Sequence, residues 1–338
     1  MLPRIFERQQ SYSAQASRTT RRVVLRRTTR SDHNRTSEYY AKVASLWKDV
    51  DLELQLKGAK REVARPYPST FAAMPIPTLL GLPYDAASSF VRGAAHAPAK
   101  IREALHSLAG NSWTETLVDI SAPGVMRDGG DVDFWRSDDP HHAIEQAIEH
   151  LIAGGGSPVS LGGDHSVTYP TIKALRPHHK RLTILQIDAH PDLYDEFDGN
   201  RFSHACPFAR IMESGLADRL VQAGIRTMTD HQRSQAERFG VEVVDMRAWE
   251  AGRRPVVDGP LYISIDLDGI DPAFAPGVSH PEPGGLSVRD VIAIIQGAHG
   301  SLVGGDVVEC NPDVDPTGLT SRVAAKLVKE LVASMQSV

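Results

Sequence analysis

The sequence of 338 residues is poor in cysteine, with only Cys206 and Cys310. Two cysteines in so long a chain exclude the framework of a disulfide-stabilised secreted protein and indicate a reducing compartment. Neither cysteine lies in a pattern with histidine that marks a thiol nucleophile, so we interpret both as small core residues.

The chain also lacks a long apolar run and an excess of positive charge. No run of apolar residues approaches the length of a transmembrane helix, which predicts no membrane association. The formal net charge of −5 argues against binding of nucleic acid through a basic face. A chain of this length buries a large core, as one domain with extensions or as two domains.

Acidic residues are scarce at the N-terminus, where residues 1–36 are rich in Arg, Ser, Thr and Gln. This composition cannot form a packed core, and we expect a disordered arm in a cytoplasmic protein. The same composition resembles an organelle transit peptide, so import into an organelle is the alternative. Residues 37–74 are expected to form a helical extension and a linker, and residues 75–338 the folded domain.

The most informative stretch runs from Leu182 to Asp192. Its first half, Leu-Thr-Ile-Leu-Gln-Ile, is typical of a buried strand. Asp188, His190 and Asp192 then occupy every other position. Because side chains alternate faces in an extended chain, these three groups project to one side.

Two further segments repeat this arrangement. Residues 158–161 lead into Gly-Gly-Asp164-His165, and residues 261–265 lead into Asp266 and Asp268. Carboxylates gathered at strand ends repel one another unless cations lie between them. Two histidines and four aspartates suit two divalent cations, and ligation without thiolate indicates Mn²⁺, with Zn²⁺, Co²⁺ and Ni²⁺ as alternatives. The predicted ligands are His165, Asp188, His190, Asp192, Asp266 and Asp268.

The rest of the folded domain alternates strand and helix signals. This alternation predicts an α/β fold, a three-layer sandwich in which a mostly parallel sheet has helices on both faces. Asp128-Gly-Gly-Asp131 reads as a turn before an edge strand. The loop with Ser88, Ser89 and Arg92 is expected at the same end of the sheet as the metals, either as a wall of the site or as a simple connection.

Three motifs carry a resemblance to a known family. Gly-Gly-Asp-His-Ser, Asp-Ala-His-Pro-Asp and Ser-Ile-Asp-Leu-Asp-Gly-Ile-Asp-Pro look like the signatures of the ureohydrolase (arginase/agmatinase) family, in its order and spacing. The likeness covers residues 79–331 and is closest in detail to plant-type arginases and agmatinases. It implies an arginase-like fold, a hydrolase that releases urea from a guanidino compound, and a homo-oligomer, a trimer or a hexamer.

The resemblance also implies a role for each site residue. His165, Asp188, Asp192 and Asp266 would bind one Mn²⁺, and Asp188, His190, Asp266 and Asp268 the other. The family's guanidinium-binding residue matches Glu309, and its proton-shuttling histidine matches His204. Catalysis is therefore assigned to His204, Glu309 and Asp268. Asp164 and Asp271 would orient loops and ligands, and the role of His280 is left open.

The loop after the central motif bears on the substrate. It carries Asp195, Glu196 and Asp198, with Asn200 and Arg201 as the obvious carboxylate partners. This excess of acidic residues favours a substrate with a cationic tail. We therefore predict that the substrate is agmatine, which is hydrolysed to putrescine, and that Asp195 and Asn200 bind its tail. The alternatives are arginase and then guanidinobutyrase. A non-catalytic binding protein on the same fold is the alternative from another class.

Overall fold

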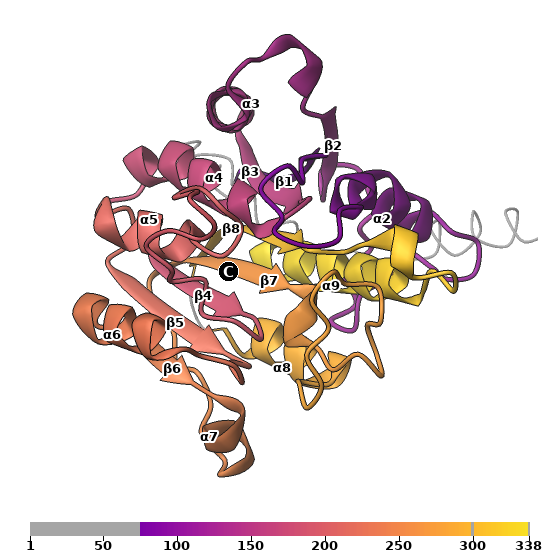
Figure 1. The fold of residues 1–338 in the computed structure, drawn as a ribbon. Coiled ribbons are helices and arrows are strands. Elements are labelled where there is room, and N and C mark those ends of the chain that lie inside the picture. The colour runs from indigo at the N-terminus through magenta and orange to yellow at the C-terminus, as the bar shows by residue number, and fades with distance from the viewer. Residues whose placement is uncertain (1–74, 299–300, 337–338) are drawn as a thin grey trace, which may run out of the picture. The chain divides into compact units, whose positions relative to one another are not determined.

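The computed structural model describes residues 75–298 and 301–336. The arm predicted for residues 1–36 and the extension predicted for residues 37–74 lie outside the described residues, so the domain boundaries stay a prediction. The described strands form one eight-stranded sheet in the order β2-β1-β3-β8-β7-β4-β5-β6, and every pairing is parallel (Figure 1). The strands are β1 Ile76–Gly81, β2 Arg127–Asp131, β3 Gly156–Leu161, β4 Thr183–Ile187, β5 Arg219–Ala223, β6 Glu242–Val244, β7 Pro260–Asp266 and β8 Ser301–Val308.

Helices cover both faces of the sheet (Figure 1). One face packs against α2 Ala97–Leu105, α8 Val288–Gly297 and α9 Leu319–Gln336, and the other against α3 Pro140–Ala153, α4 Thr168–Leu175, α5 Pro207–Glu213 and α6 Asp230–Phe239. The short helix α7, Met246–Glu250, follows β6. The predicted three-layer α/β fold is therefore confirmed.

The core follows the two-residue period of the strands. In β4, Ile184 belongs to the cluster beneath α4, α5 and α6, whereas Leu185 belongs to the cluster beneath α8 and α9. Both side chains are fully buried, as expected for a central strand covered on both faces. Cys206 and Cys310 are buried and unpaired, and burial raises the pKa of each thiol to about 12. They are core residues, as predicted.

One element differs from its prediction. Residues 127–131, with the sequence Arg-Asp-Gly-Gly-Asp, are not a turn but form the exposed edge strand β2, paired with β1. Arg102 on α2 stabilises this edge: it contacts Asp128, Asp131 and the backbone carbonyl of Gly130. The strand has no apolar side chain to bury, which is why the composition of this segment indicated a turn.

The segments that follow the carboxyl ends of β3, β4, β7 and β8 form the central part of one sheet edge. These four strands are neighbours in the order β3-β8-β7-β4, although they are far apart in the sequence. Parallel strands place their carboxyl ends at the same edge, so the polar residues that follow them converge. Among the described helices, none is both long and apolar enough to cross a membrane.

Candidate metal centre

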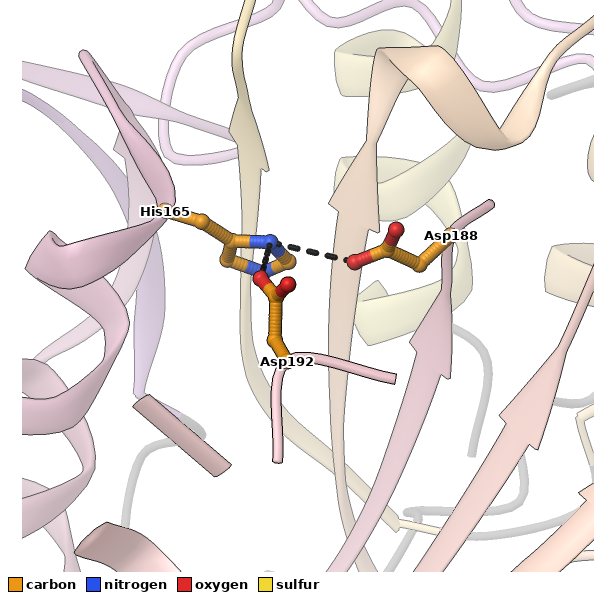
Figure 2. Close-up of side chains that lie close together, drawn as sticks. All are labelled: His165, Asp188 and Asp192. Atoms are coloured by element: carbon orange, nitrogen blue, oxygen red, sulfur yellow. Dashed lines mark ion pairs between the residues drawn. The ribbon is translucent and has the colours of Figure 1, made fainter. Parts of the chain in front are cut away.

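His165 lies at the centre of the first ligand group. Its Nδ1 atom is 3.2 Å from an oxygen of Asp188, 3.1 Å from one of Asp192 and 3.1 Å from one of Asp266. The imidazole and the Asp188 carboxylate are fully buried, and the other two carboxylates are nearly so. Figure 2 shows Asp188 and Asp192 directed at the same ring nitrogen.

A second group adjoins the first. The Nδ1 atom of His190 lies 3.0 Å from a carboxylate oxygen of Asp268 and 3.6 Å from one of Asp188. Ligand atoms of Asp188, His190 and Asp268 all lie within 4.8 Å of one another, as do those of His165, Asp188 and Asp192. Asp188 belongs to both groups, which is the arrangement expected of a carboxylate that bridges two cations.

The protonation state of His165 tests whether a cation fits. Ser264 donates its single hydroxyl proton to Asp306 over 2.7 Å, so the 2.9 Å contact between Ser264 and Nε2 of His165 requires a proton on Nε2. The opposite nitrogen, Nδ1, is buried and makes no hydrogen bond of good geometry with any of the three carboxylates around it. In its neutral form the ring therefore directs the lone pair of Nδ1 at three carboxylates. A divalent cation between them would be bound by the imidazole and by all three carboxylates.

The charge balance of the cluster leads to the same conclusion. Burial and the neighbouring Asp188 raise the pKa of Asp192 to about 6. Burial, Asp268 and Asp188 raise the pKa of Asp266 well above its usual value. Burial would likewise raise the pKa of Asp188, but the adjacent imidazoles of His165 and His190 hold that pKa below its usual range. Four buried carboxylates with two imidazoles are thus short of positive charge, and two dications correct this.

The backbone around the ligands is tightly packed. A Cβ atom on Gly163 would lie 1.8 Å from the carbonyl oxygen of Tyr84, so only glycine fits before Asp164 and His165. Asp188 is fixed by the amide of His190, which donates over 2.6 Å. Asp192 has a φ of 51°, an uncommon value outside glycine that turns its carboxylate back towards His165.

Glu309 and His204 form the other functional pair. Oε1 of Glu309 accepts hydrogen bonds from the backbone amide of His165 over 2.9 Å and from Nδ1 of His204 over 3.1 Å. Oε2 is buried and lacks a hydrogen-bond partner among the described residues. Glu309 also has a φ of 60°, a strained conformation for a non-glycine residue and a common feature of functional sites.

The two groups perturb each other's protonation. Burial favours neutral imidazole at His204, but the adjacent Glu309 outweighs it and raises the pKa of His204 to about 9. Burial opposes ionisation of Glu309, but His204 holds the pKa of that carboxyl below its usual value. The pair is therefore an imidazolium and a carboxylate at neutral pH, with Oε2 of Glu309 still available as an acceptor.

A cavity of about 200 Å³ opens beside the predicted ligands. Four of the six predicted ligands line it, together with two further histidines, His204 and His280, whose ring centroids lie 5.0 Å apart. The four ligands are His190, Asp192, Asp266 and Asp268. The part of the lining that belongs neither to the ligands nor to histidine is uncharged: Ser89, Tyr194, Phe197, Ala205, Thr227, Thr229 and Gln232. Ser89 thus belongs to a wall of the site, and its loop is more than a simple connection.

Asp195 and Asn200 are not among the residues that line this cavity. The Asp195 carboxylate accepts hydrogen bonds from Arg201 over 3.0 Å and from the buried Arg210 over 2.8 Å. The amide oxygen of Asn200 accepts from the backbone amide of Phe202. The roles proposed for Asp195 and Asn200 in binding the substrate tail stay predictions.

Sequence reasoning missed the residues behind His165. Asp306 on β8 accepts from Tyr262, Thr168 and Ser264, and all four side chains are buried. A signal was present, because Asp306 is a lone acid within the otherwise apolar and glycine-containing run Leu-Val-Gly-Gly-Asp-Val-Val. A charged residue in a buried strand requires partners.

Comparison with known proteins identifies the family. The model of the arginase family matches residues 77–333. "Arginase 1, mitochondrial" of Oryza sativa subsp. indica is 46% identical over 274 residues, which cover 76% of this chain and 81% of the relative. The solved arginase from Medicago truncatula is 44% identical with a TM-score of 0.74 over 78% of this chain and 88% of that one. A hypothetical agmatinase from Burkholderia thailandensis is 29% identical with a TM-score of 0.67, over 77% and 85% of the two chains.

These similarities correct the preference for agmatine as substrate. The arginases are similar at 44–46% identity, whereas the agmatinase structure is a more distant neighbour. The physical error was to count acidic residues without their partners, since Arg201 and Arg210 neutralise the carboxylate of Asp195. The centre described above is that of a metal-dependent hydrolase acting on guanidino C–N bonds, and the chain belongs to the arginase family.

Proposed function

We propose that this protein is an arginase, which hydrolyses arginine to ornithine and urea. The similarity to plant arginases at 44–46% identity carries the proposal. The uncharged part of the cavity lining supports it, because the tail of arginine has an ammonium and a carboxylate and no net charge. A lining without charged side chains beyond the ligands and histidines suits such a tail better than the purely cationic or purely anionic tail of other guanidino compounds.

Glu309 is proposed to hold the guanidinium group. A carboxylate matches two guanidinium N–H groups in a planar pair. Oε2 of Glu309 has no partner among the described residues, and Oε1 retains acceptor capacity beside its bonds to His165 and His204. This arrangement would place the guanidinium carbon beside the ligand cluster.

The six ligand residues are proposed to hold two Mn²⁺ ions, the metal that mixed imidazole and carboxylate ligation favours. Asp188 and Asp266 would bridge them, and Asp268 would serve both as ligand and in catalysis. When bound, two such ions lower the pKa of a shared water towards neutrality, which supplies the nucleophile for the guanidinium carbon.

His204 is proposed as the acid that protonates the leaving amine. Its hydrogen bond to Glu309 engages Nδ1 and raises the pKa of the ring to about 9, and the Nε2–H, on the side of Ser89 in the cavity lining, would be the proton delivered. The proton makes the amine a better leaving group, and the C–N bond breaks to give urea and ornithine.

Urea release tests this function. The protein, loaded with Mn²⁺, is given arginine, agmatine and 4-guanidinobutyrate in parallel, with Asp268→Asn as the inactive control. We expect urea chiefly from arginine, and bound manganese near two equivalents by mass spectrometry. Urea from another substrate in preference to arginine overturns the proposed specificity, and one bound metal overturns the binuclear assignment.

Organelle import is proposed in place of a cytoplasmic location. The rice relative is named a mitochondrial arginase, and residues 1–36 have the composition of a transit peptide. Residues 1–36 fused to a fluorescent protein should enter mitochondria or plastids, and a diffuse cytoplasmic signal contradicts this.

A homo-oligomer, a trimer or a hexamer, is also proposed on the family resemblance. Light scattering coupled to gel filtration measures the mass directly, and a particle near the chain mass of 36.9 kDa contradicts it.

A further inference from the structure

His204 is held at both ring nitrogens by groups from different parts of the chain. Its Nδ1 atom faces Glu309 at 3.1 Å, and its Nε2 atom faces the hydroxyl of Ser89 at 2.9 Å. Glu309 is buried, whereas Ser89 is exposed and lines the cavity. One nitrogen of the ring therefore points to the interior and the other towards solvent.

The donors and acceptors assign a distinct task to each nitrogen. An ionised carboxylate only accepts, so Nδ1 of His204 carries a proton and donates it to Glu309. A serine hydroxyl both donates and accepts. Ser89 can thus accept from Nε2 when His204 is an imidazolium and donate to Nε2 when the ring is neutral.

The loop that carries Ser89 is fixed to the site. The amide of Ala87 donates to the buried Asp164 over 2.9 Å, and the carbonyl of Ala87 accepts from the amide of His204 over 3.2 Å. Ser89 follows this anchor by two residues. The hydrogen bonds of Ala87 therefore hold the backbone beside Ser89 in place, and this restrains the distance between Ser89 and His204.

We propose that Ser89 relays protons between solvent and Nε2 of His204, an inference that rests on the proposed role of His204 as the acid. In the outward step the Nε2 proton passes to Oγ of Ser89 while the hydroxyl proton passes to a solvent water. The imidazole becomes neutral and solvent gains one proton, with no change of electrons. The reverse step recharges the ring after each turnover.

The neighbouring Ser88 provides a matched control. Its hydroxyl is buried and has no hydrogen-bond partner among the described residues. Ser88→Ala and Ser89→Ala remove the same atom from adjacent positions in one loop, and only the second removes the contact with His204. Ser89→Thr keeps the hydroxyl.

Proton exchange at His204 tests the relay without reference to any substrate. In protein labelled with ¹⁵N-histidine and loaded with diamagnetic Zn²⁺, the resonance of His204 is assigned by its loss in His204→Gln. Exchange of its Nε2 proton with water should be about tenfold slower in Ser89→Ala and unchanged in Ser88→Ala. Equal or faster exchange in Ser89→Ala overturns the relay, whatever substrate the enzyme uses.

Turnover provides the second readout. With Mn²⁺ and arginine, Ser89→Ala should lower kcat about tenfold with KM changed less than about twofold, and added imidazole buffer should restore much of the rate. Ser89→Thr and Ser88→Ala should retain the wild-type kcat. A loss in Ser89→Ala that appears in KM, or that buffer does not restore, counts against the relay. If the wild type releases no urea from arginine, the proposed function fails and the exchange rate alone decides the relay.

Discussion

Nε2 of His165 lies 2.9 Å from the hydroxyl oxygen of Ser264, on the side of the ring opposite the carboxylates. Because Ser264 donates onward to Asp306, this contact selects the tautomer that leaves Nδ1 free for a cation. Ser264→Ala should therefore weaken Mn²⁺ binding at this site about tenfold to 100-fold, as measured by calorimetry. Tyr262→Phe, which removes another donor from the same Asp306 carboxylate, should leave the affinity near that of the wild type. Equal affinities in the two variants contradict this account.

Glu309→Gln tests the guanidinium site. The amide keeps the shape of the side chain but loses the charge and half of the acceptor capacity, so kcat/KM for arginine should fall by about 100-fold or more. Metal content should stay at the wild-type level, because Glu309 is not a proposed ligand. Glu196→Gln, which changes an exposed acid in the neighbouring loop, is the control and should be close to wild type. If Glu309→Gln lowers kcat/KM only slightly, another residue binds the guanidinium group.

Asp266→Asn should have opposite effects on stability with and without metal. In the metal-free protein the raised pKa of Asp266 means that folding must either protonate this carboxyl or bury its charge beside Asp268 and Asp188. The neutral amide lacks this cost, so Tm should rise by about 2–4 °C per kcal/mol relieved. With Mn²⁺ present, Tm should fall below that of the wild type, because a ligand is lost and binding stabilises only the folded state. Asp258→Asn, which changes an exposed acid paired with Arg219, is the control and should shift both values equally. A lower Tm in both conditions indicates that repulsion among the carboxylates does not limit the stability of the metal-free protein.

The ion pair of His204 and Glu309 predicts a pH dependence of stability in the metal-free protein. The folded-state pKa of His204, about 9, lies above the ordinary histidine value of 6.5. The stabilisation is therefore complete below about pH 6.5 and is lost as pH rises through about 9. The free energy of unfolding of the wild type minus that of His204→Asn should decrease by about 3 kcal/mol across this window.

His141→Asn is a control of opposite sign for that experiment. Burial lowers the pKa of His141, so its neutral form is favoured in the folded chain and its contribution to stability is lost as pH falls. Urea denaturation at a series of pH values measures both differences. If the difference in unfolding free energy between the wild type and His204→Asn does not change with pH, the imidazole is uncharged in its pair with Glu309.

Asp195→Asn separates binding of the substrate tail from local stability. The carboxylate is held by Arg201 and by Arg210, whose side chain is only 5% exposed. Losing this charge leaves a buried guanidinium with Glu213 as its remaining ion-pair partner, so Tm should fall. KM for arginine should change less than about threefold. A KM increase of tenfold or more with an unchanged Tm would show that Asp195 contacts the tail.

The proposed ligand residues can be named from the sequence because their pattern is local. Asp188, His190 and Asp192 share one side of an extended segment whatever the rest of the chain does, since side chains alternate along a strand. Parallel strands then align their carboxyl ends, which brings Asp266 and His165 to the same edge without further information. The layers were predictable because strand and helix signals alternate along the chain, and such alternation forms a parallel sheet with helices on both faces.

The partners of those residues were not predictable, because they depend on contacts across the chain. Ser89 and His204 are 115 positions apart, and nothing in either loop indicates the other. The charge of Asp195 is cancelled by Arg210, which faces it only because α5 packs beside the loop. The sequence by itself determined the fold class, through the alternation of strands and helices, and the family, through its three motifs. It also predicted the six ligands at the strand ends. Only the tertiary structure decided which acids are free, which imidazole nitrogen faces solvent and what charge the cavity presents, since each depends on side chains meeting at close range.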